Sequence, residues 1–189
     1  MTHRNLFMLL LGLTIPILLA DGLLMANDDE GEAGSSAAAA NSSLSLDAAA
    51  RQDSLFIVIN GEFNVLKPIF EKSCFDCHSR FTKYPWYHKI PGVKQLLDRD
   101  VKEGREQLDL SSGFPFSGKG TLLEILGDMK EEVGEGDMPL LIYRIMHWET
   151  GLSGARRDSV VNWLDSARVL VVRFYDQEGI PYEVKKAED

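Results

Sequence analysis

The chain has 189 residues, 44% hydrophobic and 26% charged, with a net charge of −9 and only two cysteines. This length and apolar content suit one folded domain with a tail and exclude a chain that is disordered throughout. The acidic balance, without any cluster of Lys and Arg, argues against a nucleic-acid partner, and two cysteines are too few for a disulfide-stapled scaffold.

The N-terminal segment, residues 1–26, has the pattern of an export signal. Arg4 precedes fifteen uncharged residues, 6–20. Because this run is shorter than the roughly 20 residues that cross a bilayer, it favours a cleaved signal peptide. If Asp21 is tolerated near the interface, the apolar stretch extends to Ala26 and the segment is instead an uncleaved anchor. Both alternatives predict an exported, periplasmic or otherwise extracytoplasmic protein, and the second tethers it to the membrane.

Residues 27–53 are rich in Ala, Ser, Gly and acidic residues. Such a composition cannot bury enough apolar surface to offset the entropy of ordering, so it predicts a flexible linker. The linker carries a net charge of −5, which leaves −4 for the predicted domain, residues 54–189.

The predicted domain is expected to be almost entirely helical, which gives an all-α fold. Only Leu55–Ile59 has the pattern of a strand. Apolar residues recur at helical spacing over 66–74, 93–108, 122–133 and 160–174, and a shorter helix is expected over 140–147. Ser153 is the expected N-cap of the last helix. Loops are expected over 79–91, 109–119 and 134–139.

The sequence Cys74-Phe75-Asp76-Cys77-His78 has the spacing of a c-type haem attachment site. On one helical turn, positions i, i+3 and i+4 share a face, so two thiols can reach the two vinyl groups while His78 reaches the iron. The motif therefore predicts one haem c, bound covalently through Cys74 and Cys77, with His78 as an iron ligand.

Three alternatives compete with haem at these cysteines. A thioredoxin-like site expects a βαβ setting, which the predicted helices do not provide. A structural zinc site needs two further ligands, for which the domain offers only His88 and His147. A disulfide would close a strained small ring and would not need the adjacent histidine. In an exported protein with no other cysteines, haem is the favoured interpretation.

A second axial ligand to the iron is expected from a methionine or a histidine. Met138 lies in the Gly-rich loop 134–139, where Pro139 favours an extended conformation of the preceding residue. An apolar side chain on a polar loop needs a buried destination, so Met138 is the predicted ligand. The other candidates are Met129, which also fits a core helix face, Met146, His88 and His147.

Aromatic residues follow the predicted iron ligand directly. Tyr84, Trp86 and Tyr87 are predicted to contact the haem, as hydrogen-bond donors to its propionates or as a cover for the ring edge. Simple packing of the domain is an equally good alternative for them. Arg105 is a further propionate candidate, or else a surface residue in a charged helical series.

The ordered series of motifs from Cys74 to Trp163 resembles the bacterial haem-binding domain family of exported proteins. The resemblance rests on Cys74-Phe75-Asp76-Cys77-His78-Ser79, Thr82, Tyr84-Pro85-Trp86-Tyr87, Asp100-Val101, Gly104-Arg105, Gly136, Met138-Pro139, Tyr143, His147, Leu152 and Trp163. It implies a cytochrome c-like helical domain around one covalent haem, with His78 and Met138 as ligands. The chain departs from the family at Asp109-Leu110-Ser111 and Phe114, where the family has Asn-Phe-Ser and a nearby Trp.

The favoured function is a monohaem c-type cytochrome that transfers single electrons and is not an enzyme. With the iron saturated by His78 and Met138, it would exchange electrons with an unidentified redox partner protein, and its acidity suits a basic docking face. The alternative is a haem enzyme or sensor, peroxidase-like or gas-binding, in which the sixth site is open and His88 or His147 acts as a distal acid or base. A thiol redox or zinc protein would carry no haem.

Overall fold

The computed structural model describes residues 33–183. The chain divides into two units, residues 1–39 and 40–189, and of the first unit only the helical residues 33–39 are described. The predicted export segment, residues 1–26, lies outside the described residues. None of the described helices combines the length and the apolar character that a bilayer span requires.

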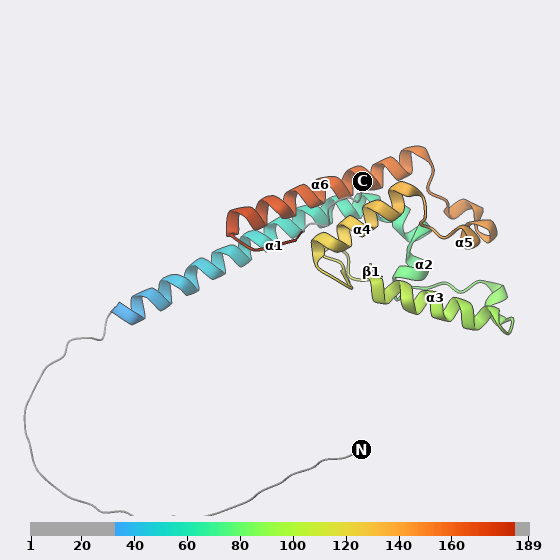
Figure 1. The fold of residues 1–189 in the computed structure, drawn as a ribbon, viewed down its shortest axis with the longest axis horizontal. Coiled ribbons are helices and arrows are strands. Elements are labelled where there is room, and N and C mark those ends of the chain that lie inside the picture. The colour runs from blue at the N-terminus through green and yellow to red at the C-terminus, as the bar shows by residue number, and fades with distance from the viewer. Residues whose placement is uncertain (1–32, 184–189) are drawn as a thin grey trace, which may run out of the picture. The chain divides into compact units, whose positions relative to one another are not determined.

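The described chain is mostly helical, which confirms the all-α fold class (Figure 1). Its elements are, in order, α1 (Ala33–Ser73), α2 (Phe75–His78), η1 (Trp86–Lys89), α3 (Val93–Gln107), β1 (Leu108–Asp109), β2 (Ser117–Gly118), α4 (Leu122–Glu135), α5 (Leu141–Met146), η2 (Trp148–Thr150) and α6 (Gly154–Glu178). The two short strands pair antiparallel, with Leu108 opposite Gly118.

The helices predicted from apolar spacing agree with α3, α4 and α5 to within a few residues. Helix α6 starts earlier than its apolar pattern, and its N-cap is Ser153, as expected. The start of α4 is fixed by reciprocal bonds between two residues. The backbone amide of Thr121 donates to the Glu124 carboxylate at 2.7 Å, and the amide of Glu124 donates to the Thr121 hydroxyl at 3.3 Å. This capping box satisfies amides that the first helical turn leaves unpaired.

The predicted strand over Leu55–Ile59 was wrong, because this run lies inside α1. Ile59, Phe63 and Phe70 are almost completely buried, while Val58 is 56% exposed. Buried positions spaced by four and seven residues define one face of a helix. The run of apolar residues looks like a strand in the sequence, but the residues that are buried follow the spacing of a helix.

The predicted flexible linker over 27–53 also differs from the structure, since the chain is helical from Ala33 onward; residues 27–32 lie outside the described residues. The guanidinium of Arg51 donates to both carboxylate oxygens of Glu178, at 2.7 and 2.8 Å. Alanine is the strongest helix former, and this contact with the end of α6 gives the helix a tertiary partner that composition alone does not reveal.

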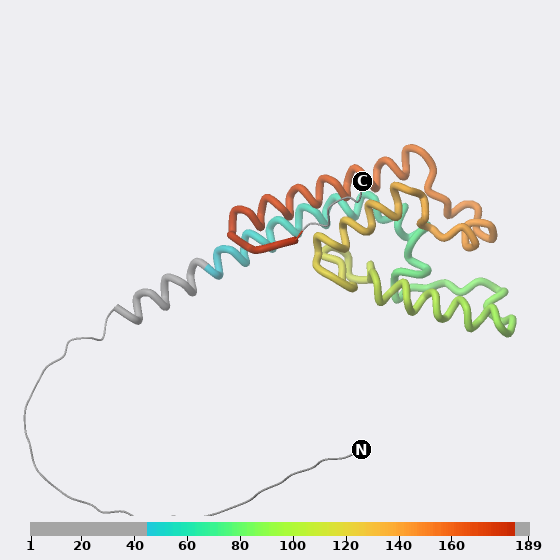
Figure 2. The backbone as a smooth tube through the Cα atoms, viewed as in Figure 1, coloured from blue at the N-terminus to red at the C-terminus, as the bar shows by residue number. Residues whose placement is uncertain are grey.

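Helices α1, α4 and α6 supply most of the hydrophobic core of the unit 40–189, and Figure 2 shows their backbones running side by side. Trp163 of α6 lies at the centre of an aromatic cluster. Its ring centroid is 5.6 Å from that of Phe63, 5.9 Å from Phe70, 6.0 Å from Phe116 and 6.4 Å from Phe114. Large aromatic side chains contribute much buried area, so this cluster holds α1 and the loop 110–116 against α6.

Replacing Leu164 of α6, which has no exposed surface, tests the importance of this core. We expect Leu164→Ala to lower the free energy of unfolding by about 2–5 kcal/mol, because it leaves a cavity between packed helices. Val169→Ala on the same helix is the control, since Val169 is 50% exposed, and it should change stability by no more than about 0.5 kcal/mol. Urea unfolding measures both; equal effects would contradict the packing described here.

Candidate functional site

A cavity of about 620 Å³ lies between the end of α1, α2, α3, α4 and the loop that follows α4. Cys74, Cys77, His78, Met129 and Met138 all contribute to its wall. The structure thus brings together both cysteines, the adjacent histidine and two of the candidate methionines, although Met138 is sixty residues from His78 in the sequence. This volume is within the usual range for small-molecule and cofactor sites.

The motif forms one helical turn, as its spacing predicts. The carbonyl of Cys74 accepts from the amide of Cys77 at 3.2 Å and from that of His78 at 2.9 Å. The two cysteines do not form a disulfide bond with each other. Burial is the main reason that the pKa of Cys74 rises to about 12 and that of Cys77 to about 11. Among the described residues, no group of three or more His, Cys, Asp and Glu is arranged to hold a metal ion.

His78 is held by the segment 108–110 on both its ring and its backbone. Its Nδ1 lies 3.1 Å from the carbonyl oxygen of Leu108, and its own carbonyl accepts from the amide of Leu110 at 2.8 Å. Because a carbonyl only accepts, Nδ1 carries the proton and Nε2 keeps its lone pair. Burial lowers the pKa of His78, which favours this neutral ring. A neutral imidazole with a free Nε2 is suited to bind a metal.

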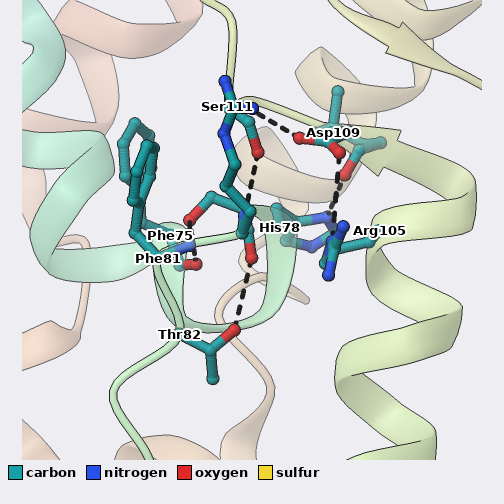
Figure 3. Close-up of polar contacts among 10 residues, drawn as sticks. Phe75, His78, Phe81, Thr82, Arg105, Asp109 and Ser111 are labelled. Atoms are coloured by element: carbon teal, nitrogen blue, oxygen red, sulfur yellow. Dashed lines mark hydrogen bonds and ion pairs between the residues drawn. The ribbon is translucent and has the colours of Figure 1, made fainter.

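The turn after His78 is fixed by hydroxyl groups to which the sequence analysis gave no role (Figure 3). The hydroxyl of Ser79, which is fully buried, donates to the carbonyl of Phe75 at 2.7 Å. Thr82 donates to the carbonyl of Ser79 at 3.2 Å, and the amide of Arg80 donates to the Ser111 hydroxyl at 2.8 Å. These bonds hold the turn that carries His78 against the loop after β1.

Helix α3 approaches the motif closely at Gly104. A Cβ atom at this position would lie 3.1 Å from the carbonyl oxygen of Cys77. That separation is shorter than an ordinary van der Waals contact, so a larger side chain would push α3 away from α2. The absence of a side chain at Gly104 therefore lets α3 form one side of the cavity.

The loop after α4 is wound tightly around a single carbonyl group. The amides of Gly136, Asp137 and Met138 all donate to the carbonyl of Glu132. Gly136 has a φ of 87°, a left-handed conformation that closes the helix and that glycine adopts without strain. This C-terminal turn directs the chain back so that Met138 lies in the cavity wall.

Asp76, one of the two residues between the cysteines, joins the motif to two other parts of the chain. One carboxylate oxygen accepts from the amide of Lys83 at 3.0 Å and the other from the hydroxyl of Tyr143 at 2.7 Å. Burial, followed by this bond to Asp76, raises the pKa of Tyr143, so the phenol stays a donor. No sequence pattern indicated this contact, because Tyr143 is distant in the chain.

Tyr84, Trp86 and Tyr87, which were predicted to contact the haem, are not among the residues that line the cavity. The ring of Tyr84 stacks on His88 with centroids 4.0 Å apart, and Trp86 is 74% exposed. The hydroxyl of Tyr87 lies 3.3 Å from Nδ1 of His147, whose ring in turn stacks on Tyr143. The contact between Tyr87 and His147 joins η1 to the end of α5, and haem contact by the three aromatic residues stays a prediction.

Two other candidate residues, Arg105 and His88, do not line the cavity. Arg105 pairs with the carboxylate of Asp109 at 3.9 Å, as Figure 3 shows, and it does not line the cavity. Burial opposes ionisation of Asp109, but bonds from Ser111 and the charge of Arg105 hold its pKa below the usual value. Nε2 of His88 bonds to Asp98 at 2.6 Å, outside the wall.

Ser73 and Lys119 line the cavity without having been identified from the sequence as site residues. The hydroxyl of Ser73 is buried and has no hydrogen-bond partner among the described residues. Buried hydroxyls are almost always bonded, so this unpaired hydroxyl beside the cavity is an exception. Lys119 follows β2 and is exposed at the cavity.

Residues 44–166 match the haem-binding domain family. The chain belongs to this family. The match begins inside the predicted linker, in agreement with the helical structure found there. Cytochrome c peroxidase Ccp of Escherichia coli (strain K12) is 29% identical over 106 residues, which are 55% of this chain and 23% of that protein. The chain therefore spans about a quarter of the length of this relative. No solved structure matches.

The cavity fits the haem that the family binds. Its wall includes a histidine whose Nδ1 donates to a carbonyl, two methionines and two half-buried cysteines around one space of about 620 Å³. Soft sulfur and imidazole donors of this kind are the ligands that haem iron takes in proteins. The protein is accordingly a haem-binding protein.

Gly104→Val tests the close approach of α3 to the motif. We expect a loss of about 1–3 kcal/mol in the free energy of unfolding, because the side chain overpacks the contact with the Cys77 carbonyl. Gly61→Val is the matched control, since a Cβ on Gly61 meets nothing within 4 Å, and the better helix propensity of valine should leave stability unchanged or slightly higher. Chemical unfolding of both variants measures the difference, and a neutral Gly104→Val would refute the argument.

Tyr143→Phe tests the bond that links the motif to α5. Removing a hydroxyl that donates to the Asp76 carboxylate should cost about 1.5–3 kcal/mol of stability. Tyr182→Phe removes the same group from an exposed bond to Asp176 and should cost clearly less, because water replaces the lost donor. Thermal and urea unfolding compare the two; an equal loss in both variants would show that the Asp76 contact has no special weight.

Proposed function

We propose that this protein is a monohaem c-type electron carrier. In this proposal Cys74 and Cys77 bind the haem covalently, and His78 and Met138 are the axial ligands of the iron. The observation that carries the proposal is the convergence of these four side chains on one cavity from two separate parts of the chain. Once bound, the haem supplies a one-electron Fe(III)/Fe(II) couple.

Covalent attachment is chemically simple for the two thiols. Each thiol adds across one vinyl group, so that an S–H bond breaks, a C–S bond forms, and the proton moves to the other vinyl carbon. No oxidant or reductant is consumed. The helical turn that places Cys74, Cys77 and His78 together supports this role, because one element then fixes both thioethers and the proximal ligand.

Met138 is a better axial ligand than the other methionine in the wall. Met129 is only 7% exposed and belongs to the hydrophobic core on α4, where its side chain already packs. Met138 lies on a loop outside the core, held by the bonds to the Glu132 carbonyl. A preorganised loop presents a thioether to the iron at little further entropic cost. His78–Met138 ligation would leave the iron no open position for a substrate.

The main alternative is a peroxidase-like enzyme or a gas sensor. The name of the matched relative, a cytochrome c peroxidase, is the reason to consider the enzyme. Such a site would use a distal histidine as acid or base. Among the described residues that line the cavity, His78 is the one histidine, while His88 and His147 are engaged by Asp98 and Tyr87 outside it. This arrangement supports the electron carrier over the enzyme.

Export and a redox partner belong to the same proposal. The N-terminal pattern of residues 1–26 supports a protein that works in the periplasm or elsewhere outside the cytoplasm, either released or held by an uncleaved anchor. Several carboxylates line the cavity, including Glu103, Asp128 and Glu131. Their charge supports a partner protein with a basic docking face, whose association would weaken as salt concentration rises.

The test is to produce the full chain together with a c-type haem maturation system. We expect haem that stays on the polypeptide in a denaturing gel, and low-spin spectra in both oxidation states. Met138→Ala should lose the low-spin spectrum and bind carbon monoxide, because it removes a ligand. Met129→Ala and Met146→Ala are the matched controls and should keep the spectrum, although Met129→Ala lowers stability.

Three outcomes would contradict the proposal. A wild-type chain without covalent haem would exclude a c-type carrier. Low-spin spectra that survive Met138→Ala but not Met129→Ala would transfer the axial role to Met129. A wild-type protein that is high-spin and binds carbon monoxide readily would instead favour the enzyme or sensor.

A further inference from the structure

The cavity wall carries a strongly unequal distribution of charge. Its acidic members are Asp76, Asp100, Glu103, Asp128, Glu131 and Glu132. Among the described residues that line the cavity and carry a fixed positive charge, Lys119 stands alone. Arg99 pairs with two of these carboxylates, those of Asp100 at 3.1 Å and Glu103 at 3.8 Å. A haem carries two propionates, which are anions, so the remaining acidic charge of the wall opposes their binding. A cation near one propionate would offset that repulsion, and the wall offers a single residue for it.

Lys119 is positioned by its backbone. Its amide donates to the carbonyl of Gln107 at 3.1 Å, directly beside the pairing of Leu108 with Gly118. A Cβ on Gly118 would lie 2.2 Å from the Gln107 carbonyl oxygen, so the two chain segments are in direct contact there. Leu108 is also the residue whose carbonyl accepts from His78. The same strand pair therefore positions both the imidazole and the Lys119 backbone.

The side chain of Lys119 is available for a ligand. It forms no ion pair with any described residue, and it is exposed at the cavity. Two lysines outside the cavity wall are engaged by carboxylates: Lys130 pairs with Asp165 at 2.7 Å, and Lys102 lies 3.7 Å from Glu106. Arg105, the propionate candidate from the sequence, is paired with Asp109 and lies off the wall.

We propose that Lys119 pairs with a haem propionate and, by its charge, favours the reduced iron. This inference rests on the proposed haem carrier and adds a positioning residue to it. The reduced haem has one positive charge less than the oxidised haem, so a nearby cation stabilises reduction by electrostatics alone. Lys119 acts through the propionate and does not touch the iron.

Potentiometric titration of the covalent holoprotein tests this role. Lys119→Gln should shift the Fe(III)/Fe(II) equilibrium at least threefold toward Fe(III), which is a drop of ~30 mV at 59 mV per tenfold change. Lys119→Glu changes the charge by two and should shift the equilibrium about tenfold toward Fe(III). Lys119→Arg keeps the positive charge and should have the wild-type potential. Lys102→Gln and Lys102→Glu are matched controls on a side chain that is 75% exposed and off the wall. They should shift the equilibrium by less than 1.5-fold, because water and salt screen them.

The outcomes separate this inference from the proposed function. Covalent haem is checked on a denaturing gel, and far-UV circular dichroism checks the fold of each variant. If wild type and the Lys119 variants all carry covalent haem but have equal potentials, or if the Lys102 variants shift as much, the role of Lys119 is refuted and the carrier stands. If the wild type carries no covalent haem, the carrier fails and the inference fails with it.

Discussion

The contact of His78 with the segment 108–110 is the constraint on which the cavity depends. The imidazole donates to the Leu108 carbonyl, and the Leu110 amide donates to the His78 carbonyl. Together they fix the ring tautomer, the direction of Nε2 and the distance between α2 and the end of α3. Because Gly118 pairs with Leu108, the short strand pair supports the segment that holds the His78 imidazole.

The hydrophobic core and the cavity are formed largely by different elements. Helices α1, α4 and α6 bury the aromatic cluster around Trp163, while α2, the loops and α5 surround the cavity with hydrogen bonds. Helices α1, α2 and α4 belong to both regions, α2 through Phe75 in the core and His78 in the wall. The end of α1 leads directly into Cys74, and α4 contributes Met129 to the core and to the wall. Covalent haem would therefore fill a space already framed by packed helices.

The features that could be predicted from sequence are those set by local rules. Apolar periodicity located α3, α4 and α6, and the spacing of Cys74, Cys77 and His78 predicted haem binding, which the family match supports. The helical stretch before residue 54 was missed because its support, the Arg51–Glu178 pair, joins distant residues. The aromatic residues after His78 were predicted to contact either the haem or the rest of the domain, and in the structure Tyr84 packs against His88 while Tyr87 lies beside His147.

The two residues between the cysteines show that an attachment motif has its own tertiary partners. Phe75 is buried and stacks with Phe81 at 6.5 Å, while Asp76 bonds to Lys83 and Tyr143. Both positions are written as variable in the attachment pattern, but in this chain the fold dictates them. A motif with other residues at these two positions, transplanted from a cytochrome c, would keep its thiols and histidine and lose the connections that orient them. To replace this motif with that of another protein while keeping its contacts, the loop that carries Phe81 and Lys83 and helix α5 would have to be replaced with it.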